Sequence, residues 1–130
     1  MPELRHDPLK DNWVLLAPRR RERPIKLQIS RKKEGEDCPF CEGREHLTPK
    51  EIWAIREEGE PDGPGWKVRV VPNKYPALSP NVKPVSLSYN DLFLKKGGYG
   101  FHEVILETPR HDQDLADLDH DHLYLVLYTY

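Results

Sequence analysis

Short apolar runs separated by polar stretches dominate the pattern along this chain. The run at residues 13–16 ends before Pro18, which predicts a strand. Residues 66–70 alternate apolar and basic side chains, the pattern of a half-buried strand. Residues 101–107 form a third predicted strand, which Pro109 closes.

Residues 51–56 fit two kinds of secondary structure. The Thr-Pro-Lys-Glu sequence at 48–51 has the shape of a capping box with proline at the first helical position, which favours a helix. The run is short and rich in isoleucine and tryptophan, which favours a strand. Because turn-forming residues fill 59–65, we expect a strand that returns through a hairpin to 66–70.

A final helix is predicted after Asp119, which is a favourable N-cap residue. Its apolar positions recur at i, i+3, i+4 and i+7 and form one stripe. They are Leu123, Val126, Leu127 and Tyr130. Because no glycine cap, basic last turn or proline ends this helix, we expect the chain to be truncated there. The stripe would then self-associate or pack against a surface outside these residues.

Composition narrows the class of protein. One domain is expected from 130 residues, with a thin core, since 37% are hydrophobic and 32% charged. A net charge of −2 gives no general attraction to nucleic acid. The sequence has no apolar run near the ~20 residues that span a bilayer, so we expect no membrane helix. It has no signal peptide either, so a cytoplasmic protein is expected.

Two polar stretches, 19–37 and 79–96, are predicted to be connections. The first is basic and is expected to be an exposed loop. It carries Arg19, Arg20, Arg21, Arg23, Lys26, Arg31, Lys32 and Lys33. Arginine binds phosphate bidentately, so two of these side chains beside a rigid turn could hold a diphosphate. A solvated basic loop is the alternative.

The Cys-Pro-Phe-Cys motif at 38–41 is the sharpest chemical signal. Cys38 and Cys41 have a spacing that suits one tetrahedral zinc ion, while a redox dithiol or unliganded thiols are the alternatives. A structural zinc site takes four ligands, so in a chain with two cysteines histidine must contribute. The candidates are His6, His46, His102, His111, His120 and His122. Spacing does not choose among them, although His120 and His122 are expected to be solvated at an acidic helix start.

Five blocks in this order resemble the N-terminal half of the galactose-1-phosphate uridylyltransferase family, a branch of the histidine-triad superfamily. They are RHDP with WVL in 5–15, APRRRERP at 17–24, CPFCEG at 38–43, VPNKYPAL at 71–78 and GFHEVILETPRH at 100–111. The resemblance implies an α+β fold with a histidine-triad-like antiparallel sheet and a packed helix. Residues 1–130 would be the N-terminal half only.

The resemblance also implies a nucleotidyltransferase of galactose metabolism. In this family UDP-glucose gives its UMP to a histidine, and the uridylyl-histidine passes UMP to galactose-1-phosphate. Zinc is the implied cofactor and a homodimer the implied assembly. The implied zinc ligands are Cys38, Cys41 and His111. The implied substrate-binding residues are Arg20, Arg23, Asn73 and Lys74.

Two departures from the family pattern leave alternatives open. Lys74 stands where the family has aspartate, and lysine donates hydrogen bonds where aspartate accepts them. The family's His-x-His-x-Gln nucleophile segment and fourth zinc ligand lie beyond residue 130, so we expect no catalytic residue here and no activity from this chain alone. The alternatives are a related enzyme of the ADP-glucose phosphorylase type and a stand-alone zinc-stabilised binding module.

Overall fold

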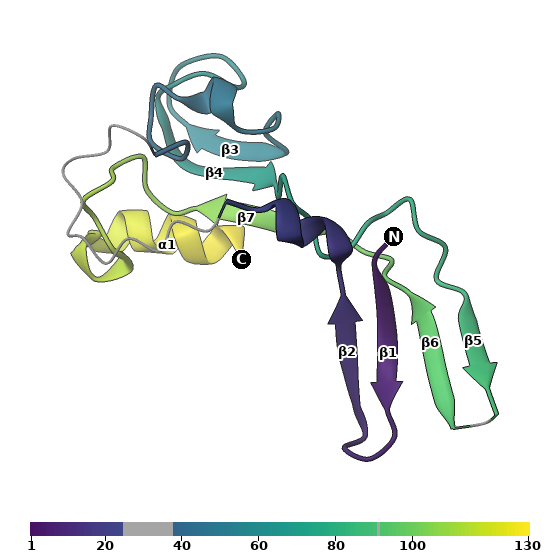
Figure 1. Cartoon of the computed structure of the whole chain (residues 1–130). Helices are drawn as coiled ribbons and strands as arrows, with labels where there is room; N and C mark the ends of the chain where they lie inside the picture. The colour runs from purple at the N-terminus through teal and green to yellow at the C-terminus, as the bar shows by residue number, and fades with distance from the viewer. Residues whose placement is uncertain (25–37, 91) are drawn as a thin grey trace. The chain divides into compact units, whose positions relative to one another are not determined.

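The computed structural model describes residues 1–24, 38–90 and 92–130. The chain divides into two compact units. Unit 1 consists of Met1–Lys26 and Tyr75–His102, and unit 2 of Leu27–Lys74 and Glu103–Tyr130. Figure 1 shows the four-stranded sheet of unit 1, and the three-stranded sheet and helix of unit 2.

Unit 1 is built on an antiparallel sheet with strand order β2-β1-β6-β5. Its strands are β1 (Glu3–Asp7), β2 (Asn12–Leu16), β5 (Ser86–Tyr89) and β6 (Phe93–Gly97). The predicted strand at 13–16 is therefore confirmed, within β2. The turn between β1 and β2 is held by Asp7, whose Oδ1 accepts a hydrogen bond from the backbone N–H of Leu9 at 3.0 Å.

The expected connection at 79–96 is wrong, because β5 and most of β6 lie within it. The sequence of β6 is Phe-Leu-Lys-Lys-Gly, which has no alternation of apolar and polar residues. It forms a strand because it pairs with β1 on one side and β5 on the other. Lys96 lies opposite Leu4, and its Nζ sits 4.3 Å from the centroid of the Trp13 ring. Such a cation–π contact, together with strand pairing, stabilises a lysine-rich strand in the sheet.

The basic stretch after β2 begins with a short 3-10 helix, η1 (Pro18–Glu22), where an exposed loop was expected. Proline at the first position suits a helix start because its φ is preset and it has no N–H to leave unpaired. Residues 25–37, which include the basic side chains from Lys26 to Lys33, lie outside the described part of the chain.

Unit 2 is built on an antiparallel sheet with strand order β3-β4-β7. Its strands are β3 (Trp53–Arg56), β4 (Trp66–Pro72) and β7 (Glu103–Leu106). The strand and hairpin expected between 51 and 70 are confirmed, as is a strand within 101–107. The buried apolar residues of this unit are Trp66, Val68, Val70, Val71, Leu106 and Val126.

The half-buried pattern expected for 66–70 is wrong at Arg69. Arg69 is 1% exposed because β4 is the central strand of the sheet. Its guanidinium donates to Glu51 Oε2 at 2.9 Å, Thr48 Oγ1 at 2.9 Å and Asp62 Oδ1 at 3.1 Å. Sequence alternation alone does not distinguish a solvated arginine from one that is neutralised by partners far along the chain.

The predicted final helix is α1 (His120–Thr129), and Asp119 is its N-cap, with its side chain accepting from the His122 backbone N–H at 2.8 Å. The expectation that the whole stripe lacks a packing surface within these residues is wrong for two of its four positions. Val126 is buried and Leu123 half-buried, but Leu127 is 61% and Tyr130 is 67% exposed. Helix α1 packs on β4, and the face it buries is narrower than the stripe.

The described residues thus form an α+β fold of antiparallel sheets with one α-helix, as expected. The 3-10 helices η2 (Glu45–Leu47) and η3 (Leu115–Asp117) lie in unit 2. In the part of the chain that the structure describes, we find no helix with the length and apolar character needed to cross a bilayer.

Candidate functional site

Both cysteines lie in a tight turn that precedes η2. The backbone N–H of Arg44 donates to Cys41 O at 3.2 Å, which closes the turn. Gly43 has a φ of 85°, in the left-handed region that favours glycine, so the chain can turn away directly after the motif. This turn holds Cys38 and Cys41 close together, and both side chains are half-buried.

His111 approaches the cysteines from the far end of the sequence. It follows β7 after a turn in which Arg110 N donates to Thr108 Oγ1 at 3.2 Å. The backbone N–H of Glu42 donates to Pro109 O at 3.2 Å. This backbone bond ties the cysteine turn directly to the turn that carries His111.

Cys38, Cys41 and His111 form one group whose ligand atoms all lie within 4.8 Å of one another. The Cys41 Sγ and His111 Nδ1 atoms are 3.4 Å apart. Two ligands of one tetrahedral zinc ion stand about 3.6 Å apart, given the usual Zn–S and Zn–N bond lengths. The donor set and its spacing therefore fit zinc, and the exposed side at His111 leaves access for a further ligand.

The other five histidines do not join this group among the described residues. His6 Nε2 contacts Asp11 Oδ1 at 2.9 Å, and His102 Nδ1 accepts from the Ala77 N–H at 2.9 Å. His46 and His120 are exposed.

The expectation that His122 is solvated is wrong. Its Nε2 contacts two backbone carbonyl oxygens, of Lys67 at 3.1 Å and Glu107 at 2.8 Å. Carbonyl oxygens only accept, so this nitrogen carries the proton. The histidine fastens the start of α1 to the sheet, whereas its neighbour His120 is exposed as expected.

A buried glutamate, Glu45, supports the cysteine turn, and no sequence pattern predicted its role. Glu45 is 6% exposed. Burial raises the pKa of its carboxyl, but hydrogen bonds from the Trp66 indole and from backbone N–H groups outweigh burial and leave that pKa below its ordinary value. Many glutamates surround it in the sequence, and no local pattern sets it apart.

Arg20 and Arg23 lie in and directly after η1, in unit 1. Arg20 is half-buried, and its Nη1 donates to Tyr75 O at 2.9 Å, so part of its guanidinium holds the turn after Lys74. Arg23 is exposed. Burial lowers the pKa of His102, and the nearby guanidinium groups of Arg20 and Arg23 lower it further.

Asn73 and Lys74 directly follow β4, in unit 2. Asn73 is half-buried and Lys74 is exposed. The four substrate-binding residues implied by the resemblance are therefore divided equally between the two units. Unit 1 carries Arg20 and Arg23, and unit 2 carries Asn73 and Lys74.

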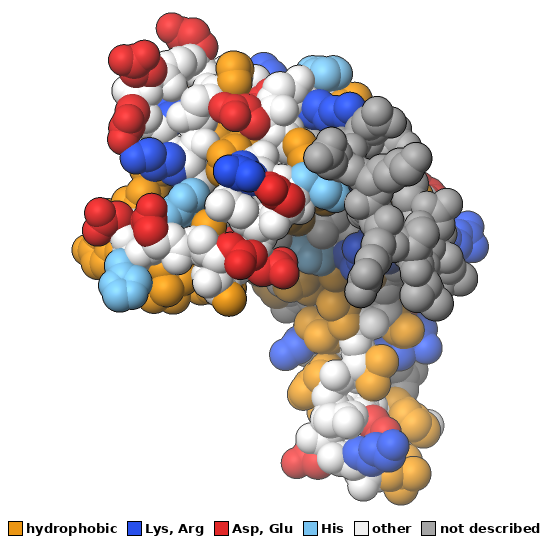
Figure 2. Space-filling model, turned by 90° about the vertical axis from the view of Figure 1, so that its left-hand side faces the viewer, with side chains coloured by type: hydrophobic (Ala, Val, Ile, Leu, Met, Phe, Trp, Pro, Cys, Tyr) orange, Lys and Arg blue, Asp and Glu red, His pale blue; other side chains and the backbone are white. Residues whose placement is uncertain are grey.

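Charge is distributed unevenly between the units. Basic residues outnumber acidic ones in unit 1, and the reverse holds in unit 2. Figure 2 shows acidic side chains, in red, scattered over much of the face of unit 2 that it presents. Arg20 and Arg23 thus lie in the unit that has the excess of basic residues.

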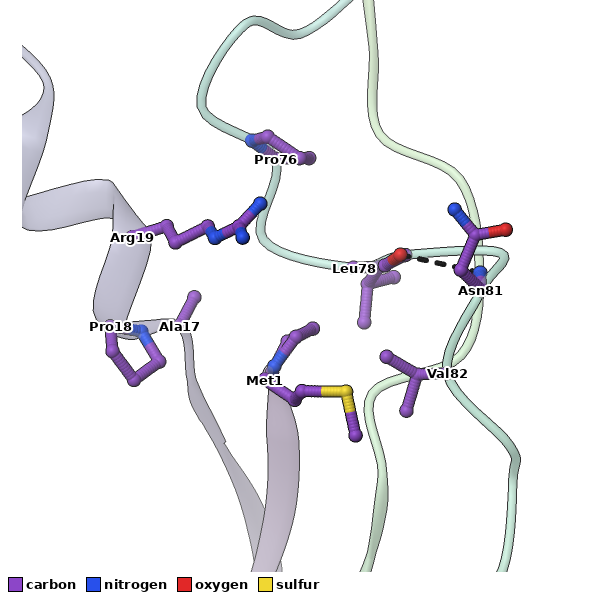
Figure 3. Close-up of a pocket in the computed structure, with 10 residues that line it drawn as sticks. Met1, Ala17, Pro18, Arg19, Pro76, Leu78, Asn81 and Val82 are labelled. Carbon is purple, nitrogen blue, oxygen red and sulfur yellow. Dashed lines mark hydrogen bonds between the residues drawn. The ribbon is translucent and has the colours of Figure 1, made fainter.

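Unit 1 also contains a cavity of about 310 Å³. Figure 3 shows Arg19 extending toward Pro76 on one side, with Met1, Leu78 and Val82 on the other. The lining is largely apolar, and it includes none of the residues that the resemblance assigns to zinc or substrate.

The chain matches a family model along its whole length. The description of that model is "galactose-1-phosphate uridyl transferase, N-terminal domain", and it covers residues 1–130. The chain is 36% identical over 123 residues to the ADP-glucose phosphorylase of Arabidopsis thaliana, covering 91% of this chain and 34% of that protein. It is 29% identical over 118 residues to the galactose-1-phosphate uridylyltransferase of Thermotoga maritima, covering 91% of this chain and 30% of that protein.

Solved structures also match this chain. A crystal structure of an Arabidopsis thaliana ADP-glucose phosphorylase with bound ADP-glucose superposes with a TM-score of 0.57 and 33% identity, over 100% of this chain and 36% of that one. A uridylyltransferase mutant gives a TM-score of 0.63 and 29% identity, over 98% of this chain and 31% of that one.

This chain therefore spans about a third of the length of these relatives. The family model nevertheless covers every residue of it, and the fold is the α+β arrangement of antiparallel strands that the matched structures share. The chain belongs to the galactose-1-phosphate uridyl transferase family of the histidine-triad superfamily, and it corresponds to the N-terminal domain.

Proposed function

We propose that this chain is the metal-carrying, sugar-nucleotide-binding N-terminal part of a nucleotidyltransferase or phosphorylase. The observation that carries the proposal is the convergence of Cys38, Cys41 and His111 in a chain whose whole length matches the family model. Its relatives include an ADP-glucose phosphorylase and a galactose-1-phosphate uridylyltransferase.

In this proposal Cys38, Cys41 and His111 hold a zinc ion. A fourth ligand comes from water, from a partner chain or from a segment beyond residue 130. Zinc bound there would join the cysteine turn to the turn after β7 and contribute to folding free energy. Dimerisation and a cytoplasmic location stay predictions.

The substrate in this proposal is a nucleoside diphosphate sugar. Arg20 and Arg23 donate to its phosphates, since guanidinium groups pair with phosphate oxygens, and Asn73 and Lys74 contact the nucleoside. Lys74 and the 36% identity to an ADP-glucose phosphorylase favour ADP-glucose as the nucleotide. Transfer of UMP from UDP-glucose to galactose-1-phosphate is the second candidate, which the family model supports.

Metal binding is tested by zinc analysis of the purified chain after dialysis. We expect about one zinc ion in the wild type and a large loss of zinc in Cys38→Ser and His111→Ala, because each removes one ligand. His46→Ala is the matched control, since this exposed histidine lies outside the group. Equal zinc content in all four proteins would show that the group is not the site.

Nucleotide binding is tested by calorimetric titration with ADP-glucose and with UDP-glucose. We expect tighter binding of ADP-glucose, and about tenfold weaker binding in Arg23→Met, which loses charged hydrogen bonds to phosphate. Arg21→Met is the matched control, because Arg21 lies in the same basic run and is also exposed. Tighter binding of UDP-glucose would favour the second candidate, and equal effects of the two variants would contradict the role of Arg23.

A further inference from the structure

Two glutamates attach the cysteine turn to the start of β4 by hydrogen bonds. Glu42 Oε1 accepts the backbone N–H of Gly65 at 2.7 Å, and Glu45 Oε1 accepts the indole N–H of Trp66 at 2.8 Å. These acceptors are three residues apart in the sequence, and their donors are neighbours. The turn is thereby held against the central strand of unit 2 at two adjacent points.

Glu45 has a second partner on the cysteine side. The same Oε1 atom accepts the backbone N–H of Gly43 at 3.1 Å. One buried carboxylate oxygen thus joins the residue two places after Cys41 to Trp66, which is 2% exposed. A buried carboxylate is costly unless it is hydrogen-bonded, and both of these partners satisfy it.

We propose that Glu45 is a positioning residue for the metal group, an inference that rests on the proposed metal site. It acts through the turn: Gly43 is fixed by Glu45, and Arg44 N holds Cys41 O. The N–H of Glu42 in the same turn holds Pro109 O, two residues before His111. Glu45 therefore sets where the cysteine sulfurs stand relative to the histidine.

Removing the acceptor oxygen would release this turn from β4. The Trp66 indole N–H and the Gly43 N–H would be left without their acceptor, and the turn would move to find others. The three ligand atoms would then be preorganised less well, which weakens metal binding. Groups that orient metal ligands from outside the ligand set typically change metal affinity by about 10- to 100-fold.

The test uses the whole chain and two substitutions of similar size. Glu45→Met removes the acceptor, whereas Glu45→Gln keeps an acceptor oxygen. Glu51→Gln is the matched control, because Glu51 is a second poorly exposed glutamate of unit 2 that bonds Arg56 and Arg69 and has no hydrogen bond to the described residues 38–43. Zinc affinity is measured by competition with a chromophoric chelator, at a temperature where circular dichroism shows each protein folded.

The absorption spectrum of the cobalt-substituted protein reports the geometry of the metal ligands, which a change in folding stability alone does not alter. We expect the zinc Kd of Glu45→Met to rise at least about tenfold, with changed cobalt d–d and thiolate charge-transfer bands. Glu45→Gln should stay within about threefold of the wild type because its oxygen still accepts both bonds. Glu51→Gln should keep the wild-type affinity and spectrum although its metal-free form unfolds more easily.

Either of two results would overturn this role: Glu45→Met binds zinc like the wild type, or Glu51→Gln weakens binding as much as Glu45→Met. Trp66→Phe, which removes the indole donor, is the second variant if Glu45→Met does not fold, and unchanged affinity there would also overturn it. A wild type that binds no more zinc than Cys38→Ser would refute the metal site itself and this inference with it. Zinc binding in the wild type together with an unaffected Glu45→Met would refute only the role of Glu45.

Discussion

At the scale of single residues, Glu51 is a poorly exposed glutamate that pairs with two arginines. Its Oε1 and Oε2 accept from Arg56 at 2.6 and 2.9 Å, and Oε2 also accepts from Arg69 at 2.9 Å. The hydrogen bonds from Arg56 lower the pKa of the Glu51 carboxyl most, burial opposes them, and Arg69 lowers it further, to about 2. The same pairing raises the pKa of Arg56.

The lowered pKa of the Glu51 carboxyl makes the free energy of unfolding depend on pH. Because its pKa falls from 4.5 to about 2 on folding, its contribution is complete above pH 4.5 and is lost as pH falls toward 2. The contribution is on the order of 3 kcal/mol. We expect Glu51→Gln to lower the free energy of unfolding at neutral pH and to flatten its decline under acid, measured by urea unfolding with a chelator present. Parallel pH curves for the two proteins would contradict this.

The candidate site was only partly predictable at this scale. The spacing of Cys38 and Cys41 pointed to a metal, but spacing left six histidines open, and only the family resemblance selected His111. The structure brings His111 to the cysteines through the Glu42–Pro109 backbone bond. Glu45 could not be predicted, because its burial depends on a hydrogen bond from Trp66, which lies 21 residues away in the sequence.

At the scale of elements, the β5–β6 hairpin shows what local pattern does not contain. Strand β6 lies between β1 and β5, and its tight packing is clearest at Gly97. A Cβ atom added there would lie 2.1 Å from Lys83 O and 2.8 Å from Val82 Cγ1. The glycine is needed because backbone and a buried valine approach it closely.

Gly97→Ala should therefore disrupt the sheet of unit 1 at the end of its interior strand β6. We expect a loss of at least about 1–3 kcal/mol in the free energy of unfolding, the usual effect of overpacking. Amide exchange should quicken in β1 and β6, while unit 2 should be unaffected. Ser88→Ala, at an exposed position of β5, is the control and should stay within about 0.5 kcal/mol of the wild type. Unchanged exchange in β1 and β6 would show that the alanine is accommodated.

At the scale of the whole molecule, the surroundings of the six histidines indicate whether one of them could act as a nucleophile. His6, His102, His111 and His122 each have a partner, respectively Asp11, Ala77, Cys41 and two backbone carbonyls. The other two, His46 and His120, are exposed and lie in unit 2 outside the metal group. The family resemblance predicts that the nucleophile is not among these six histidines.

We accordingly expect this chain alone to form no covalent nucleotidyl adduct. Intact-protein mass spectrometry after incubation with UDP-glucose, and separately with ADP-glucose, measures this directly. Loss of a nucleophile removes most of the rate enhancement of a covalent mechanism, so the mass should not change. A UMP or AMP increment that maps to any of the six histidines would show that a nucleophile lies within these residues.

The sequence by itself determined the features that depend on near neighbours in the chain. These are the strand at 13–16, the hairpin that ends at 66–70, the Asp119 cap of α1 and the cysteine motif. Apolar alternation, turn chemistry and capping act over a few residues, so a local pattern records them.

Only the tertiary structure decided the rest: the burial of Arg69 and Glu45, the strand character of the lysine-rich β6, and the face that α1 buries. Each of these depends on groups that folding brings together. Arg69 is buried because Glu51 and Asp62 neutralise it, and Lys96 sits in a strand beside Trp13. A charged residue has the same local pattern whether water or a distant partner satisfies it, so only the folded contacts can distinguish the two.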